Sequence, residues 1–178
     1  MKRILFFALT ALLVFATNSC KKEDILVNQV KLDGVKYNIV DSELDLNKRK
    51  SGGHYCVKLY LNQDKKTYIY LHVGEKLEDS DIKLTEKRIN SENYMWRVNA
   101  ILDDSYVFAS TSNPDDSPSL FSSGTLYLHE LSNEAGTSYS LNILLKNGSI
   151  KDNKTLGDGK EHTIQIGFSG KVKATVFE

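Results

Sequence analysis

Apolar and polar residues alternate along most of the chain after about Val27, and a period of two is typical of β-strands. The alternation is strongest in residues 55–61 and 67–73, which are separated by a short polar run and predict a hairpin. Asp33-Gly34 lies between two alternating segments and predicts a second, tight hairpin. The pattern therefore predicts antiparallel strands joined by short turns.

The same pattern predicts further strands toward the C-terminus. Trp96, Val98 and Ala100 share one face, so the single tryptophan is expected in the core. The charged stretch 75–93 is predicted mostly as loop, and the proline-containing stretch 111–119 as an exposed loop. The additional predicted strands lie at 94–102, 106–109, 124–131, 139–145 and 162–177.

About nine or ten short strands without a convincing amphipathic helix predict an all-β fold. We expect an antiparallel β-sandwich, jelly-roll or immunoglobulin-like, as a single domain over residues 27–178. A calycin-like β-barrel is the alternative. The distinction affects function, because a closed barrel can enclose a small apolar ligand whereas a sandwich fills its interior with side chains.

The first 19 residues have the pattern of a secretory signal peptide. Lys2 and Arg3 precede an uncharged, mostly apolar run from Ile4 to Ala16, and Cys20 follows the signal. As a helix, that run would cover only about 20 Å of a hydrocarbon layer roughly 30 Å thick. The segment is therefore expected to direct export and not to span the membrane.

The residues around Cys20 resemble known export motifs. Thr17-Asn18-Ser19-Cys20 resembles a bacterial lipobox, and Lys21-Lys22-Glu23-Asp24 looks like the surface-export signal of Bacteroidota lipoproteins. Segments 121–128 and 166–172 are similar to the ends of small Bacteroidota lipoproteins of uncharacterised function. The resemblance implies lipid attachment at Cys20 and an export signal at Lys22, Glu23 and Asp24. It also implies a tether over residues 20–26 and a location on the outer membrane, exposed at the cell surface.

Composition limits the partners and the covalent chemistry. Removal of residues 1–19 leaves 159 residues with 21 basic and 23 acidic side chains, a formal charge of −2. This balance argues against a nucleic-acid partner, which would require a basic face. With Cys20 acylated, Cys56 is the only remaining thiol, so no intramolecular disulfide is expected.

Catalytic and metal-binding patterns are weak in this sequence. The four histidines are dispersed without a paired metal-ligand spacing, although His72 and His129 are both expected to point outward and could meet. Residues 152–159 come nearest to a calcium loop, but Lys154 occupies a ligand position. Residues 167–171 lack the final glycine of a G-x-S-x-G nucleophile elbow. We therefore expect no cofactor, no metal site and no enzymatic activity.

Outward-facing aromatic residues are the better functional indication. Alternation places Tyr60, Tyr68, Tyr70 and Tyr127 on outer faces, where flat rings can stack on sugars or anchor a protein. With the membrane anchor, this predicts a non-catalytic binding or adhesion module for a glycan or a cell-surface protein. The alternatives are a barrel carrier for a small apolar ligand, a structural subunit of a surface assembly, and a hydrolase.

Overall fold

The computed structural model describes residues 25–49, 52–88, 92–113, 115, 120–134 and 138–177. Cys20 and the predicted export signal at Lys22, Glu23 and Asp24 lie outside these residues. Across the described ranges the regular structure is nearly all β, which confirms the predicted all-β class. The helical segments there are two short 3₁₀ turns, Glu75–Leu77 and Glu92–Tyr94, and neither is of a length that could cross a bilayer.

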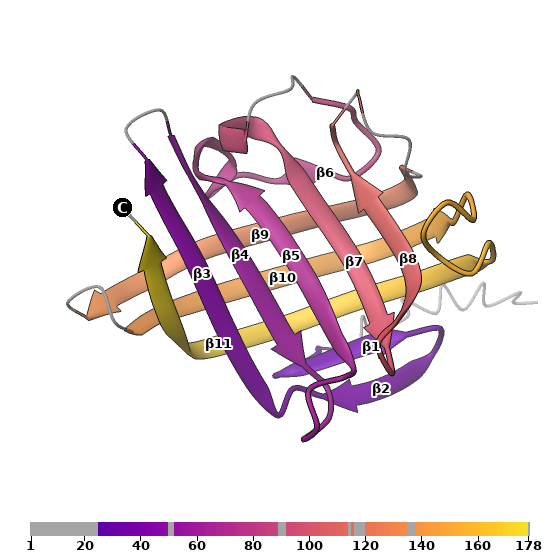
Figure 1. Cartoon of the computed structure of the whole chain (residues 1–178), viewed down its shortest axis with the longest axis horizontal. Coiled ribbons are helices and arrows are strands. Elements are labelled where there is room, and N and C mark those ends of the chain that lie inside the picture. The colour runs from indigo at the N-terminus through magenta and orange to yellow at the C-terminus, as the bar shows by residue number, and fades with distance from the viewer. Residues whose placement is uncertain are drawn as a thin grey trace, which may run out of the picture.

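The strands form one curled, mixed sheet whose two halves face each other as layers (Figure 1). The order along the sheet is β6-β9-β10-β11-β3-β4-β5-β7-β8, and the β1–β2 hairpin pairs with β11 beside this path. The front layer in Figure 1 contains β3 (Asp41–Arg49), β4 (Gly52–Tyr60), β5 (Tyr68–Gly74), β7 (Trp96–Leu102) and β8 (Ser105–Thr111). The back layer contains β6 (Ile82–Lys83), β9 (Phe121–Glu134), β10 (Ser138–Lys151) and most of β11 (Glu161–Phe177).

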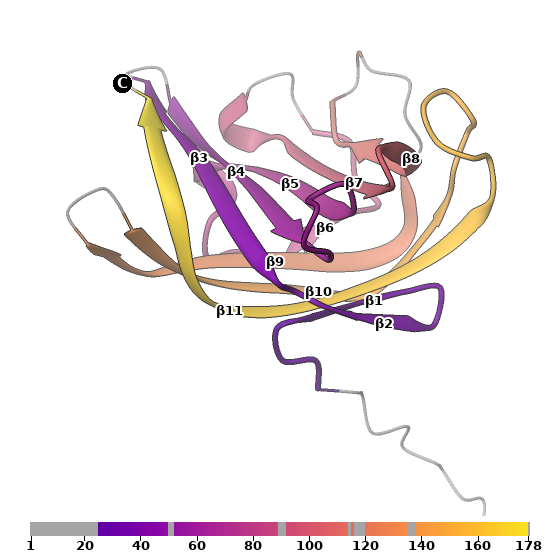
Figure 2. The same cartoon turned by 60° about the horizontal axis from the view of Figure 1, so that its bottom comes forward.

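Strand β11 connects the two layers. Its first part pairs with β10 on one edge and with β1 (Gln29–Leu32) on the other, and its last residues, Lys173 to Phe177, pair in parallel with β3. Figure 2 shows β11 bending upward between these two roles. Gly167 and Gly170 precede the residues that pair with β3, and glycines inside a strand favour a bend. This one strand therefore belongs to both layers.

The core lies between the layers and is filled by apolar side chains from both. Ile69, Leu71 and Val73 of β5 are fully buried. Trp96 of β7 is also fully buried, and its ring lies 6.3 Å from that of Phe121 on β9, centroid to centroid. The predicted core position of the tryptophan is therefore confirmed. These contacts hold the front layer against the back layer.

One turn has the geometry that its residues predict, whereas one predicted strand end differs in the structure. Asp33 and Gly34 both have positive φ, 50° and 83°, and join β1 to β2 (Val35–Asn38) as the Asp-Gly prediction requires. The strand predicted at 139–145 stops short of Asn147-Gly148, and that boundary is wrong. Strand β10 continues through it, because a register shift between Leu145 and Gly148 absorbs the irregular residues as a bulge.

Candidate functional site

The structure places the four predicted tyrosines on two different surfaces. Tyr60, Tyr68 and Tyr70 lie on the outer face of the front layer, on β4 and β5. Tyr127 lies on the outer face of β9, in the back layer, between the inward-facing Leu126 and Leu128. The outward direction was predicted from alternation, but the four rings do not form a single platform.

On the front face, tyrosine hydroxyls bond to neighbouring side chains. Tyr60 is only 5% exposed, its hydroxyl donates to Glu43 at 2.8 Å, and the Lys65 ammonium lies 4.7 Å from its ring centroid. Burial, and then the bond to Glu43, raise the pKa of Tyr60 to about 12. The Tyr70 hydroxyl donates to the Cys56 sulfur at 3.2 Å. The Tyr60 ring is therefore buried in the fold, and the Tyr70 hydroxyl is engaged by Cys56 while its ring is half-buried.

Tyr127 lies instead beside an open groove on the back layer. The register pairs Tyr127 with Leu144 and Thr125 with Lys146, so side chains of β9 and β10 form its floor. The groove has a volume of about 470 Å³. We call it the Tyr127 groove, and the residues that line it are Asp81, Gly124, Thr125, Tyr127, Leu144, Lys146 and Asn147. An aromatic ring, a hydroxyl, an amide and both signs of charge thus surround one cavity.

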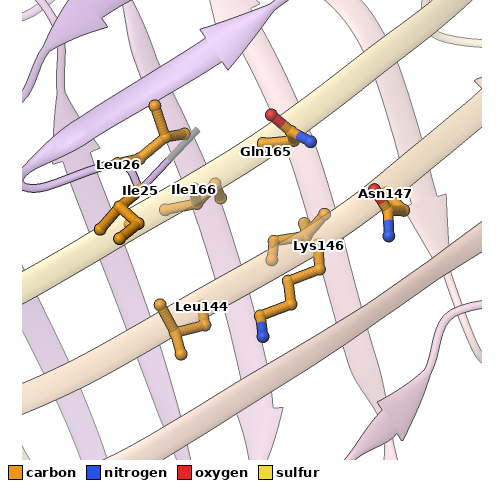
Figure 3. A pocket seen from close by; sticks show the side chains of 9 residues that line it. Ile25, Leu26, Leu144, Lys146, Asn147, Gln165 and Ile166 are labelled. Carbon is orange, nitrogen blue, oxygen red and sulfur yellow. The ribbon is translucent and has the colours of Figure 1, made fainter. Parts of the chain in front are cut away.

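A smaller, more apolar groove continues along the same layer. It has a volume of about 250 Å³ and shares Leu144, Lys146 and Asn147 with the Tyr127 groove. Figure 3 shows Ile25 and Leu26 lying over β11 beside Ile166, with Leu144 and Lys146 on the adjacent β10. We call it the Leu26 groove. The segment that precedes β1 therefore crosses the same outer face that carries Tyr127.

Gly167 permits this crossing. A Cβ atom at Gly167 would lie 2.2 Å from the carbonyl oxygen of Leu26, far inside any real contact. Only glycine lets the segment approach β11 so closely. The Leu26 groove therefore depends on glycine at this position.

His162 is buried at one end of the sandwich and is bonded to two carboxylates. The ring is 5% exposed, Nδ1 donates to Asp33 at 2.8 Å and Nε2 to Asp158 at 2.8 Å. Burial disfavours the charged ring, but the bonds to Asp33 and Asp158 outweigh it, so the pKa of His162 is raised. The backbone N–H of Asp158 donates to Val107 of β8. We call this group the His162 clasp, and it joins β11, the β1–β2 turn and the front layer.

A second polar cluster lies at the rim between the layers. Tyr55 donates to Glu78 at 2.7 Å and lies 3.1 Å from a carboxylate oxygen of Glu130, and His129 contacts Asp79. Burial and the two glutamates raise the pKa of the Tyr55 phenol. None of these five residues lines the Tyr127 groove or the Leu26 groove. The carboxylates are close together, but neither groove brings a substrate-sized space to them.

In the loop that most resembles a calcium site, the Asp152 carboxylate binds backbone N–H groups of the loop itself. One carboxylate oxygen of Asp152 accepts the N–H groups of Lys154 at 2.8 Å and Gly159 at 2.9 Å. Asp152 is 4% exposed. The carboxylate therefore orders the turn from within the loop, as Asp commonly does.

The expectation that His72 and His129 could meet was wrong, because they lie on different layers. His72 lies instead beside His54 and Cys56, a grouping that the sequence analysis missed. A usable signal was present. In a regular hairpin, the numbers of any two paired residues add up to the same value. The pair Tyr60–Tyr68 next to the turn therefore already places Cys56 opposite His72.

The described fold and grooves define an all-β, two-layer protein with a groove system on one outer face. Comparison with protein-family models, with curated proteins and with solved structures finds no match.

Proposed function

We propose that this chain is a lipid-anchored, surface-exposed module of the outer membrane that binds a glycan without catalysis, through the Tyr127 groove. The anchor proposal is supported by the signal-like residues 1–19, by Cys20 and by the acidic pair Glu23-Asp24 that follows Lys22. The binding proposal is supported by the side chains that meet at Tyr127.

The composition of the Tyr127 groove suits a sugar ring. The half-buried ring of Tyr127 offers a flat apolar surface, and Leu144 extends it from the adjacent strand. Thr125, Asn147 and Asp81 supply hydrogen-bond donors and acceptors around that surface. An aromatic surface surrounded by a few polar groups is the usual design of a small-ligand site. This arrangement is the observation that carries the proposal.

The position of the groove agrees with an anchor nearby. Ile25 and Leu26 line the adjoining Leu26 groove, and Ile25 is the fifth residue after Cys20. Five residues reach at most about 17 Å. We therefore expect the ligand to be a saccharide presented close to the membrane surface.

A glycan array with the labelled, purified protein tests the binding proposal. We expect binding by the wild-type chain and its loss in Tyr127→Ala. Tyr106→Ala is the matched control, because Tyr106 is 42% exposed on β8 in the other layer and should bind as wild type. Equal unfolding midpoints for both variants establish that the fold is intact. If no glycan binds, or if Tyr127→Ala binds as well as wild type, the glycan proposal fails and a protein partner takes its place.

Anchoring is tested separately by metabolic labelling with a radioactive fatty acid. The wild-type chain should incorporate label and Cys20→Ser should not. Protease treatment of intact cells should then remove the wild-type domain, and a Glu23→Ala, Asp24→Ala variant should become protected. Label retained in Cys20→Ser would contradict the assigned attachment site.

A further inference from the structure

Three side chains with metal-ligating atoms meet on the outer face of the front layer. They are His54 and Cys56 of β4 and His72 of β5, and their ligand atoms all lie within 4.8 Å of one another. The Cys56 sulfur lies 3.6 Å from Nδ1 of His72. The rings of His54 and His72 stack with centroids 4.5 Å apart and planes inclined by 19°.

The fold explains why residues so far apart in sequence meet. His54 and Cys56 are two apart on one strand and therefore point to the same side. The antiparallel register places His72 directly opposite Cys56. Regular strand geometry therefore fixes all three side chains, and no loop has to close around them.

The separation of the Cys56 and His72 ligand atoms fits a tetrahedral ion. Zinc binds nitrogen at about 2.0–2.1 Å and thiolate sulfur at about 2.3 Å, which sets the nitrogen-to-sulfur edge of the tetrahedron at about 3.6 Å. The observed separation of Cys56 Sγ and His72 Nδ1 is 3.6 Å. His54 and Cys56 are half-buried and His72 is 6% exposed, so solvent reaches the cluster from one side.

Neighbouring side chains support the Cys56 sulfur. The Tyr70 hydroxyl donates to the Cys56 sulfur at 3.2 Å. On the neighbouring strands, Arg97 lies opposite His72 and Asp45 lies opposite Cys56. A positively and a negatively charged residue therefore lie on the two sides of the cluster. Hydrogen bonds to the ligands of a metal orient them and tune its affinity.

We propose that His54, Cys56 and His72 form a binding site for a thiophilic divalent metal ion, Zn(II) in the first instance, with a fourth position open to water. Two imidazoles and a thiolate select zinc and its transition-metal neighbours over calcium or magnesium, which prefer oxygen ligands. Binding releases the thiol proton to solvent. The site lies on the opposite layer from the Tyr127 groove and does not depend on glycan binding.

Cobalt(II) titration of the purified protein tests the proposal, because a cobalt–thiolate bond gives an intense near-ultraviolet charge-transfer band. A Cys20→Ser background leaves Cys56 as the single thiol. We expect one equivalent of Co(II) to produce the band and Zn(II) to displace it. In Cys56→Ser the band should vanish, and competition with a chelator should show Zn(II) affinity more than about 100-fold weaker. Tyr70→Phe should weaken affinity about tenfold, as an outer-shell partner does.

The control is His129→Gln, which alters the cluster of Glu78, Asp79 and His129 and should leave the band and the Zn(II) affinity unchanged. The proposal is overturned if the wild-type chain gives no charge-transfer band, or if a folded His72→Gln variant binds Zn(II) as tightly as wild type. If Cys56→Ser does not fold, the wild-type spectrum still decides, because the band requires thiolate ligation.

Discussion

The two outer faces of this sandwich use the same residue type in opposite ways. On the front layer Tyr60 is 5% exposed and is bonded to Glu43, and Tyr70 donates to Cys56. On the back layer Tyr127 borders an open groove, and its ring centroid lies 6.3 Å from that of His129. Strand alternation directs all three rings outward, so alternation alone does not distinguish them.

The difference comes from the neighbouring strands. Lys65, in the turn between β4 and β5, binds Asp41 and Glu43 at 2.7 Å each, and this ionic network lies over Tyr60. Across from Tyr127 is the aliphatic Leu144, which has no polar group to engage the ring. An outward aromatic side chain is therefore available for a ligand only where its cross-strand neighbours leave it free.

The largest expected effect comes from the His162 clasp, which supports both faces. His162→Ala should lower the free energy of unfolding by about 3 kcal/mol at pH 6, because it removes two charge-assisted hydrogen bonds from a buried site. Denaturant unfolding followed by Trp96 fluorescence and by far-ultraviolet circular dichroism measures it, and the two signals should shift together. A loss seen by one signal alone would show that the clasp supports only one layer.

The clasp should also make stability depend on pH. The folded pKa of His162 lies above its unfolded value near 6.5, so its contribution is complete below that pH and is lost as pH rises through the folded pKa. The pKa of Asp158 is lowered to about 2: burial would raise it, but the bonds from His162 and Lys160 prevail. The contribution of Asp158 is therefore lost only in strong acid. The difference in unfolding free energy between wild type and His162→Ala should narrow from pH 6 to pH 9. A constant difference would contradict the protonated His162 ring as its source.

The next effect compares the faces directly. Tyr60→Ala should cost about 2–3 kcal/mol of unfolding free energy, because it removes a buried ring and its bond to Glu43. Tyr127→Ala should cost less than about 1 kcal/mol, because its ring borders an open groove. Urea titrations of both variants give the two values. Similar costs would remove the distinction between the faces.

A smaller effect is expected at Tyr70. Tyr70→Phe keeps the ring and deletes the hydroxyl that donates to Cys56, so it should cost about 1 kcal/mol without metal. Tyr127→Phe is the matched control and should be neutral. Thermal unfolding in the presence of a chelator compares the two, and equal midpoints would show that the bond to Cys56 contributes nothing.

The smallest effect belongs to the exposed ionic network. The hydrogen bond to Lys65, above all, lowers the pKa of both Asp41 and Glu43. Their contribution is present above the ordinary carboxyl pKa and is lost as pH falls through the folded values. An Asp41→Asn, Glu43→Gln variant should therefore lose less stability than wild type between pH 5 and pH 2. If the unfolding free energies of the two proteins fall in parallel as the pH is lowered, solvent screens the charges of the network and it contributes nothing to stability.

Local patterns in the sequence predict the strands well, since alternation and turn chemistry act over a few residues. The alternation over 67–73 gives Ile69, Leu71 and Val73 one common face, and all three are buried. In 75–93 the 3₁₀ turn Glu75–Leu77 and the brief strand β6 occur in a stretch predicted mostly as loop. The parallel pairing of β11 with β3 joins segments some 130 residues apart, and nothing local specifies it.

The candidate sites show the same limit. The outward direction of Tyr127 follows from Leu126 and Leu128, but its groove needs Leu144 and Lys146 from the next strand. The Leu26 groove needs a chain crossing at Gly167 that no periodicity predicts. Side-chain direction is local and predictable, whereas the assignment of strands to layers is not.

The most direct test of the account follows amide chemical shifts while a glycan that binds on the array is titrated into the labelled protein. We predict that the shifts concentrate at Thr125, Tyr127 and Lys146, while Tyr60 and Tyr68 on the front layer stay unchanged. Shifts centred on β4 and β5, with the Tyr127 groove silent, would contradict the central claim that the open face is the binding face.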